Sequence, residues 1–154
     1  MSRLTAGDRA PDFSLTADDG STVSSESLAG SRYVLYFYPK DDTAGCTAQA
    51  CGLRDRWTDV SATGVAIYGV SPDNAKSHGK FRAKYDLPFP LLVDEEHRLA
   101  DAYGVWIEKN FMGRNYFGNE RTTFVVGADG RIEHVLPQVK PTEHTDQLLE
   151  VLAA

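Results

Sequence analysis

The stretch YVLYFYPKDDTAGCTAQACGLRDRWTDV, from Tyr33 to Val60, holds both cysteines of the chain. Residues 33–38 are apolar and aromatic, which predicts a buried strand, and Pro39 ends it because proline has no backbone N–H to donate. After a polar turn, apolar residues recur at steps of three and four, the spacing of one helix face. That stripe consists of Cys46, Ala50, Leu53, Trp57 and Val60. The stretch therefore predicts a strand, a turn and a helix whose buried face begins with a cysteine.

Cys46 lies in the first turn of this predicted helix. Thr43 is the expected N-cap, and Gly45 allows another group to approach the backbone closely. Unpaired N–H groups and the helix dipole favour an anion at this end, so we expect Cys46 to be held as a reactive thiolate. Nearby carboxylates would oppose the thiolate, and we expect Asp41 and Asp42 to point into solvent.

Cys51 follows five residues later, about 140° around the axis of a regular helix and about 7.5 Å along it. The two Cα atoms would then be about 8–9 Å apart, whereas a disulfide spans at most about 7 Å. Either the two thiols never meet, or the helix unwinds locally to join them.

The composition is that of an ordinary globular protein. The 154 residues fit one domain, residues 1–154, and 42% hydrophobic content is enough for a substantial core. A net charge of −6 argues against nucleic acid or an anionic membrane as partner. The N-terminus lacks a secretory signal, and the longest apolar run, residues 33–38, is too short to span a bilayer. We therefore expect a cytoplasmic protein, where a disulfide is more often catalytic or sensory than structural.

The rest of the chain alternates apolar strands with helices. Residues 65–70 are a second predicted strand, Ser71-Pro72 is expected to open the next helix, and residues 88–93 form a short extended run. Residues 108–120 are polar and broken by glycine, which predicts a loop. The other expected elements are hairpins over residues 13–23 and 122–136, one helical turn over residues 24–30, and a C-terminal helix that buries Leu148, Leu149 and Leu152. This order predicts an α/β protein with a thioredoxin-like fold, in which helices flank a central mixed sheet and a β extension precedes it.

The sequence gives weaker support to other roles of the cysteines. Two cysteines in a soluble domain are by default inert packing residues, but the helix start at Cys46 reverses that expectation. Structural zinc needs four ligands and this stretch offers two, so we expect neither a metal nor a cofactor. A cysteine–histidine acyl-transfer site stays open as a minor alternative, although each histidine is more expected at the surface or at a cap. The four histidines are His78, His97, His134 and His144.

Arg121 directly precedes the predicted strand 122–126. The commoner fate of such a residue is a solvated cation at a strand end. In this fold, however, the end of that strand could bring the guanidinium over the start of the cysteine helix, where a fixed cation would stabilise a thiolate.

Pro39, Thr43 and Cys46 form the pattern P-x-x-x-T-x-x-C, which resembles the active-site motif of the peroxiredoxins. Cys51, five residues on, is similar to the spacing in their bacterioferritin-comigratory-protein (PrxQ) subgroup. The resemblance covers nearly the whole chain, through GDRAPDFSL, VWIEKNFMG, RTTFVV and DGRIEHV. One departure is Ala44, where proline is usual in this family; alanine loosens the first helical turn by about 0.4–1 kcal/mol.

The resemblance implies a thiol-dependent peroxidase that reduces hydrogen peroxide and organic hydroperoxides without a cofactor. It implies that Cys46 is the peroxidatic cysteine and Cys51 the resolving one, joined in an intramolecular disulfide. Thr43 and Arg121 would orient the peroxide and stabilise the thiolate, and Pro39 would shield the pocket. The implied reductant is thioredoxin or a similar dithiol protein, and the implied assembly is a monomer or a homodimer.

Two other functions remain open from the sequence. One is a protein disulfide oxidoreductase of the thioredoxin type, although the C-x-x-C spacing of such proteins is missing here. The other is a chaperone or signalling protein that uses oxidation only as a switch and has no enzyme activity.

Overall fold

The computed structural model describes residues 3–153. The strands are β1 (Ser14–Thr16), β2 (Thr22–Ser24), β3 (Tyr33–Phe37), β4 (Ala66–Ser71), β5 (Leu91–Val93), β6 (Trp106–Phe111), β7 (Arg114–Asn119), β8 (Thr122–Val126) and β9 (Ile132–Leu136). The helices are α1 (Ser25–Leu28), α2 (Ala44–Asp55), α3 (Trp57–Ala62), α4 (Ala75–Tyr85), α5 (Arg98–Tyr103) and α6 (His144–Ala153). None of these helices is long and apolar enough to cross a membrane.

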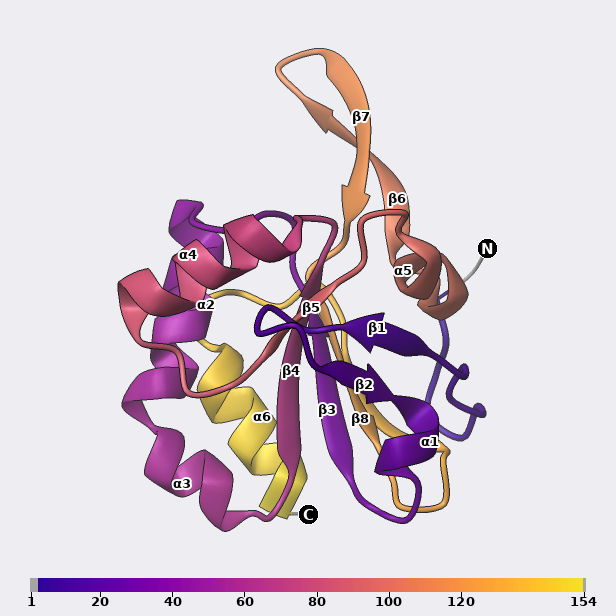
Figure 1. Cartoon of the computed structure of the whole chain (residues 1–154). Coiled ribbons are helices and arrows are strands. Elements are labelled where there is room, and N and C mark those ends of the chain that lie inside the picture. The colour runs from indigo at the N-terminus through magenta and orange to yellow at the C-terminus, as the bar shows by residue number, and fades with distance from the viewer. Residues whose placement is uncertain (1–2, 154) are drawn as a thin grey trace.

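A five-stranded sheet in the order β5-β4-β3-β8-β9 forms the centre of the molecule (Figure 1). β3, β4 and β5 run parallel, β8 runs antiparallel to β3, and β9 antiparallel to β8. β3 therefore lies in the middle of the sheet, and all of its residues are buried. The expected thioredoxin-like arrangement, a mixed sheet flanked by helices, is confirmed.

Successive side chains of β3 pack on opposite faces of the sheet, as the pleat of a strand requires. Val34 and Tyr36 belong to one apolar cluster, which helices α2, α3, α4 and α6 cover. Leu35 and Phe37 belong to a second cluster, covered by the N-terminal β extension and α5. Figure 1 shows these two sets of elements on opposite sides of the sheet. The strand before the cysteine helix is thus held rigidly from both faces.

The two ends of the chain fold as expected. β1 and β2 pair as an antiparallel hairpin, and α1 follows with Ser24 as its N-cap in a capping box. β8 and β9 form the second expected hairpin. In α6, Leu148 and Leu152 are buried and Leu149 packs against the same apolar cluster.

The loop expected over residues 108–120 is wrong. β6 and β7 pair in full register as an antiparallel hairpin, with Met112 and Gly113 at positive φ in its turn. The hairpin projects away from the body of the protein (Figure 1). Because most of its side chains are exposed, it lacks the buried apolar run or strict alternation by which a strand is recognised in a sequence.

Two helix boundaries also differ from expectation. The cysteine helix is two helices, since Arg56 leaves the helical conformation between α2 and α3 and its guanidinium binds Asp59 and Asp146. The apolar stripe continues across this break, so its spacing gave no sign of it. Ser71 does not open the next helix: it is the last residue of β4, and α4 starts at Ala75 with Asn74 accepting from the Ser77 N–H.

Candidate active site

The sulfur of Cys46 faces an arginine. Cys46 lies in the first turn of α2 and is only 2% exposed. Arg121, at the start of β8, donates from Nη1 to Cys46 Sγ at 3.4 Å and to Gln49 Oε1 at 2.7 Å. β8 is the neighbour of β3 in the sheet, so its first residues reach the end from which α2 starts. The structure thus places the guanidinium beside the cysteine rather than in solvent.

Two residues of α2 make this approach possible. A Cβ at Gly45 would lie 3.0 Å from Arg121 Nη2 and 3.3 Å from Pro141 Cγ, so glycine leaves the space that the guanidinium occupies. Gln49 is fully buried and holds the guanidinium through its carbonyl oxygen. Gln49 was not predicted as a site residue. Its only sequence signal is a polar side chain one helical turn after Cys46, toward the buried face.

Thr43 occupies the N-cap position of α2 with an extended backbone, and its carbonyl accepts from the Thr47 N–H at 2.8 Å. Its side chain does not cap the helix as expected. The hydroxyl instead donates to the Lys40 carbonyl at 2.9 Å, within the turn that precedes the helix. Pro39 lies partly buried in the same turn. Both residues are therefore at the start of the cysteine helix, with the Thr43 hydroxyl on its exposed side.

Cys51 lies further along α2 and is partly exposed, and both cysteines are free thiols. α2 is continuous from Ala44 to Asp55, so it keeps the regular helical separation of the two cysteines. Their sulfurs cannot be joined while this helix is intact.

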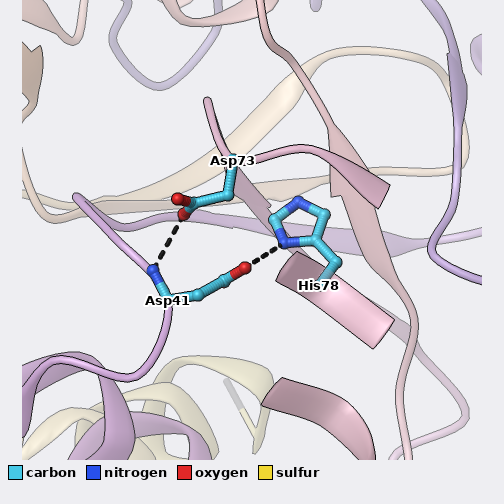
Figure 2. Close-up of side chains that lie close together, drawn as sticks. All are labelled: Asp41, Asp73 and His78. Atoms are coloured by element: carbon cyan, nitrogen blue, oxygen red, sulfur yellow. Dashed lines mark hydrogen bonds and ion pairs between the residues drawn. The ribbon is translucent and has the colours of Figure 1, made fainter. Parts of the chain in front are cut away.

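The expectation that Asp41 points into solvent is wrong. Its carboxylate is buried and accepts from Tyr38 Oη at 2.6 Å. It also accepts from His78 Nδ1 at 2.7 Å (Figure 2). These donors lie at the end of β3 and in α4, and they compensate the carboxylate for the loss of water. Asp42 is exposed, as expected, and pairs with Lys84 Nζ at 2.9 Å.

Two of the four histidines are buried, which also contradicts expectation. His78 and His144 are fully buried, and His144 Nε2 lies 2.8 Å from Thr123 Oγ1. Burial, and then the positive charge of Arg121, lower the pKa of His144 to about 3. Among residues 3–153, neither histidine makes a hydrogen bond to Cys46. The geometry therefore gives no support to a cysteine–histidine acyl-transfer site.

A second cation reaches the site from the projecting hairpin. Lys109 of β6 is partly buried, and its stem lies across Gly118 of β7. Burial, and then the charge of Arg121, lower the pKa of Lys109, while Cys46 and Glu120 act in the opposite direction. Lys109 is therefore a second cation near Cys46, although the chain as a whole is acidic.

A buried cysteine at a helix N-terminus, with an arginine donating to its sulfur beside a thioredoxin-like sheet, defines the class of thiol-dependent peroxidases. Residues 6–135 match the model of the AhpC/TSA family, and the chain belongs to this family. It is a peroxiredoxin of the bacterioferritin-comigratory-protein (PrxQ) type, which reduces a hydroperoxide with electrons from a thiol reductant. This assignment favours the peroxidase over the two other functions that the sequence left open.

Relatives in sequence and solved structures match this chain over nearly its full length. The chain is 46% identical over 147 residues to peroxiredoxin Bcp of Bacillus subtilis, covering 95% of this chain and 93% of that protein. It is 45% identical over 152 residues to peroxiredoxin Bcp of Escherichia coli, covering 99% and 97%. A cysteine-to-serine mutant of PrxQ from Xylella fastidiosa superposes with a TM-score of 0.92 at 30% identity, covering 99% and 98%. The bacterioferritin comigratory protein of Xanthomonas campestris, studied for its alkyl peroxide reduction activity, superposes with a TM-score of 0.86 at 35% identity, covering 92% and 90%.

Proposed function

We propose that this peroxiredoxin reduces hydrogen peroxide and alkyl hydroperoxides at Cys46. The Cys46 thiolate attacks the terminal oxygen of the hydroperoxide, and the O–O bond breaks. The sulfur becomes a sulfenic acid, and the departing oxygen takes up a proton to leave as water or an alcohol. The observation that carries this proposal is the contact of Arg121 Nη1 with Cys46 Sγ at 3.4 Å.

Arg121 acts at two points of this reaction. A guanidinium is permanently charged and presents several N–H groups in one plane, so it stabilises the thiolate before the attack. The N–H groups that do not bind Gln49 or the sulfur can donate to the peroxide and to the charge that develops on its leaving oxygen. Thr43 supplies a further hydroxyl at the same helix end once it turns from the Lys40 carbonyl. Pro39 forms part of the wall that keeps water from the sulfur.

Cys51 resolves the sulfenic acid. Its sulfur attacks Cys46–SOH, a disulfide forms, and the hydroxyl leaves as water. The continuous helix from Ala44 to Asp55 must unwind locally for this step, because a regular helix holds the two cysteines beyond disulfide reach. A dithiol protein of the thioredoxin type then reduces the disulfide through a mixed disulfide, and is itself oxidised.

The domain organisation, cellular location and assembly of the enzyme are also part of this proposal. β3 contributes to both apolar clusters, which supports one cooperative domain over residues 1–154. The net charge of −6 argues against nucleic acid or an anionic membrane as a partner, and we place the enzyme in the cytoplasm. The enzyme would act as a monomer or a homodimer.

Replacing each cysteine in turn tests the two roles. Cys46→Ser should abolish peroxide consumption, whereas Cys51→Ser should reduce one equivalent of peroxide and then fail to recycle with thioredoxin. Peptide mapping under non-reducing conditions should show the Cys46–Cys51 link only after one equivalent of hydrogen peroxide is added to the wild type. Full turnover by Cys51→Ser with thioredoxin would disprove the resolving role, and peroxidase activity in Cys46→Ser would disprove the site itself.

A further inference from the structure

A buried polar cluster lies beside the turn that leads into the cysteine helix. Asp41 belongs to this turn, Asp73 to the loop between β4 and α4, and His78 to α4 (Figure 2). One ligand-type atom from each residue lies within 4.8 Å of the other two. The cluster is outside the peroxide site, and the proposed mechanism gives it no task.

Both ring nitrogens of His78 face hydrogen-bond acceptors. Nε2 lies 2.8 Å from the Leu92 carbonyl oxygen, and Nδ1 lies 2.7 Å from Asp41 Oδ2. A carbonyl oxygen can only accept, so Nε2 must carry a hydrogen. A second proton must lie between Nδ1 and the Asp41 carboxylate. If that proton is on Nδ1, His78 is an imidazolium and has no lone pair to offer a metal ion.

The surroundings of Asp41 favour this placement of the proton. Besides His78, the carboxylate accepts from Tyr38 Oη at 2.6 Å and from Ser77 Oγ at 2.8 Å, and three donors stabilise an anion. Burial and the charge of Asp41 raise the pKa of Tyr38 well above its ordinary range, so its phenol stays a donor. Burial opposes a charge on His78, but the hydrogen bond and charge of Asp41 outweigh it, and the pKa of His78 is raised.

Asp41 restrains the backbone of the turn through two contacts, one from its side chain and one from its backbone N–H. The Asp41 side chain is tied to α4, and the Asp41 N–H donates to Asp73 Oδ2 at 2.8 Å, which Ser71 Oγ also binds at 2.6 Å. The next residue, Asp42, has a φ of 59°, the left-handed conformation that aspartate can adopt in a turn. Thr43 and α2 follow directly.

We propose that His78 is a positioning residue of the peroxidase: the buried imidazolium holds Asp41, and Asp41 fixes the turn from which Thr43 and the Cys46 helix start. This inference rests on the proposed function of Cys46. Because a near-attack geometry is lost with small displacements, relaxation of the turn should slow the attack of Cys46 on peroxide. Within residues 3–153, the polar contacts of His78 are with Asp41 and the Leu92 carbonyl, so His78 acts on the turn through Asp41.

The ionisable groups around His78 are few. Asp41 and Asp73 face it from the two loops, and the ring of Tyr38 packs 6.4 Å from its own, centroid to centroid. The surface pocket outside Asp41 is lined by Asp42 and by three lysines of α4, Lys76, Lys80 and Lys84. A change in the protonation of His78 can therefore be separated from these groups by a spectrum that detects its own ring protons.

Nitrogen-edited NMR of the reduced wild type tests the charge state directly. His78 should show both ring N–H protons at pH 7, with its pKa above the ordinary value of 6.5. A neutral ring with one N–H at pH 7 would overturn the proposal. Stoichiometric binding of Zn²⁺ with loss of the His78 ring signals would overturn it as well, because a metal ligand needs a free lone pair.

A double-mutant cycle tests the link from His78 through Asp41 to Cys46. The variants are His78→Gln, Asp41→Asn and the double variant, with His134→Gln as control, and the readout is the second-order rate constant of Cys46 oxidation by hydrogen peroxide in stopped flow. Each single variant should lose about tenfold, and the double variant should lose no more than the worse single one. Additive losses, or a wild-type rate constant in His78→Gln, would overturn the proposal.

The two hypotheses fail in different ways. If Cys46→Ser keeps peroxidase activity, the assignment of Cys46 is wrong, while the NMR signature of His78 is unaffected. If Cys46→Ser is inactive and the cycle is additive, only the positioning role of His78 is wrong.

Discussion

At the scale of single residues, one guanidinium nitrogen is shared by two acceptors. Arg121 Nη1 donates both to Cys46 Sγ and to Gln49 Oε1, so the buried amide fixes the direction from which the charge meets the sulfur. The amide nitrogen of Gln49 has no hydrogen-bond partner among the described residues. The side chain of Gln49 therefore orients the arginine, and we expect the planar geometry of the guanidinium to contribute to the reaction in addition to its charge.

Arg121→Lys tests this separation of charge from geometry. Lysine keeps the positive charge but cannot donate from a rigid plane to both acceptors. The loss of a charge-assisted hydrogen bond, about 1.5–3 kcal/mol, should lower the rate constant of Cys46 oxidation by about 10- to 100-fold. Stopped-flow tryptophan fluorescence measures this constant. Arg98→Lys is the control, because Arg98 is exposed and its ion pair is with Glu96. An unchanged rate constant in Arg121→Lys would show that charge alone suffices.

Gly45→Ala should damage the site without damaging the fold. The new Cβ would press on Arg121 Nη2, the far end of a flexible side chain, and push the guanidinium away from Cys46. We expect the rate constant of Cys46 oxidation to fall about tenfold. The free energy of unfolding should hold or rise by up to about 1 kcal/mol, because alanine is the better helix former.

Gly79→Ala is the matched control for this prediction. Gly79 also lies within a helix, α4, and a Cβ there meets nothing within 4 Å. It should gain the same stability by chemical denaturation and keep the wild-type rate constant. Equal rate constants in the two variants would contradict the steric role of Gly45.

How far single residues could be predicted depends on whether local chemistry or distant contacts place them. The place of Cys46 in the first turn of the helix follows from the turn and the apolar stripe. The strand end alone left Arg121 open between solvent and the start of the cysteine helix. The burial of Asp41 could not be predicted, because its partner His78 lies 37 positions away in the sequence. A carboxylate in a polar turn is expected to be solvated unless the donors that surround it are known.

At the scale of elements, α2 carries the conformational change that the proposed cycle needs. The turn before it is anchored by Asp41, whereas its far end stops at Arg56 and a separate helix follows. We expect the local unwinding that joins the two cysteines to stay within α2. The break at Arg56 limits this unwinding, since α3 need not follow.

Hydrogen exchange of the reduced and oxidised protein tests whether α2 unwinds when the disulfide forms. Amides of residues 46–55 should be protected in the reduced protein and lose protection of at least about tenfold after one equivalent of hydrogen peroxide, because the Cys46–Cys51 disulfide is incompatible with a regular helix. The Asp41 N–H and the amides of α6 should keep their protection and serve as internal controls. Equal protection of residues 46–55 in both states would contradict the proposed resolution step.

The elements that the sequence predicts well are those with buried faces. β3, β4 and β8 are short apolar runs. The alternation of β3 and β4 with helices predicts their parallel pairing, and the hairpin signal after β8 predicts the added antiparallel strands. The β6–β7 hairpin could not be predicted, because it projects away from the core and its exposed strands carry no burial pattern. It nevertheless brings Lys109 to the site, so part of the environment of Cys46 comes from the least predictable element.

At the scale of the whole molecule, two buried histidines make the stability depend on pH in opposite directions. The pKa of His78 is raised and the pKa of His144 is lowered. The pKa of His78 is raised above its ordinary 6.5, so its contribution is complete below pH 6.5 and is lost as the pH rises through the raised value. The pKa of His144 is lowered to about 3, so its contribution is complete above pH 6.5 and is lost as the pH falls toward 3. Stability should therefore be greatest near neutrality.

Urea unfolding from pH 4 to pH 9 of the wild type, His144→Gln and His78→Gln separates these two contributions. Below pH 6, the unfolded wild type takes up a proton at His144 that the folded protein does not bind, which costs up to about 1.4 kcal/mol per pH unit. His144→Gln has no such proton uptake. The difference in free energy of unfolding between this variant and the wild type should therefore shrink toward pH 4. The loss of unfolding free energy in His78→Gln relative to wild type should instead shrink as the pH rises through the raised pKa of His78, because the wild type then loses the imidazolium. Deficits that stay parallel across the whole range would show that neither histidine changes its charge on unfolding.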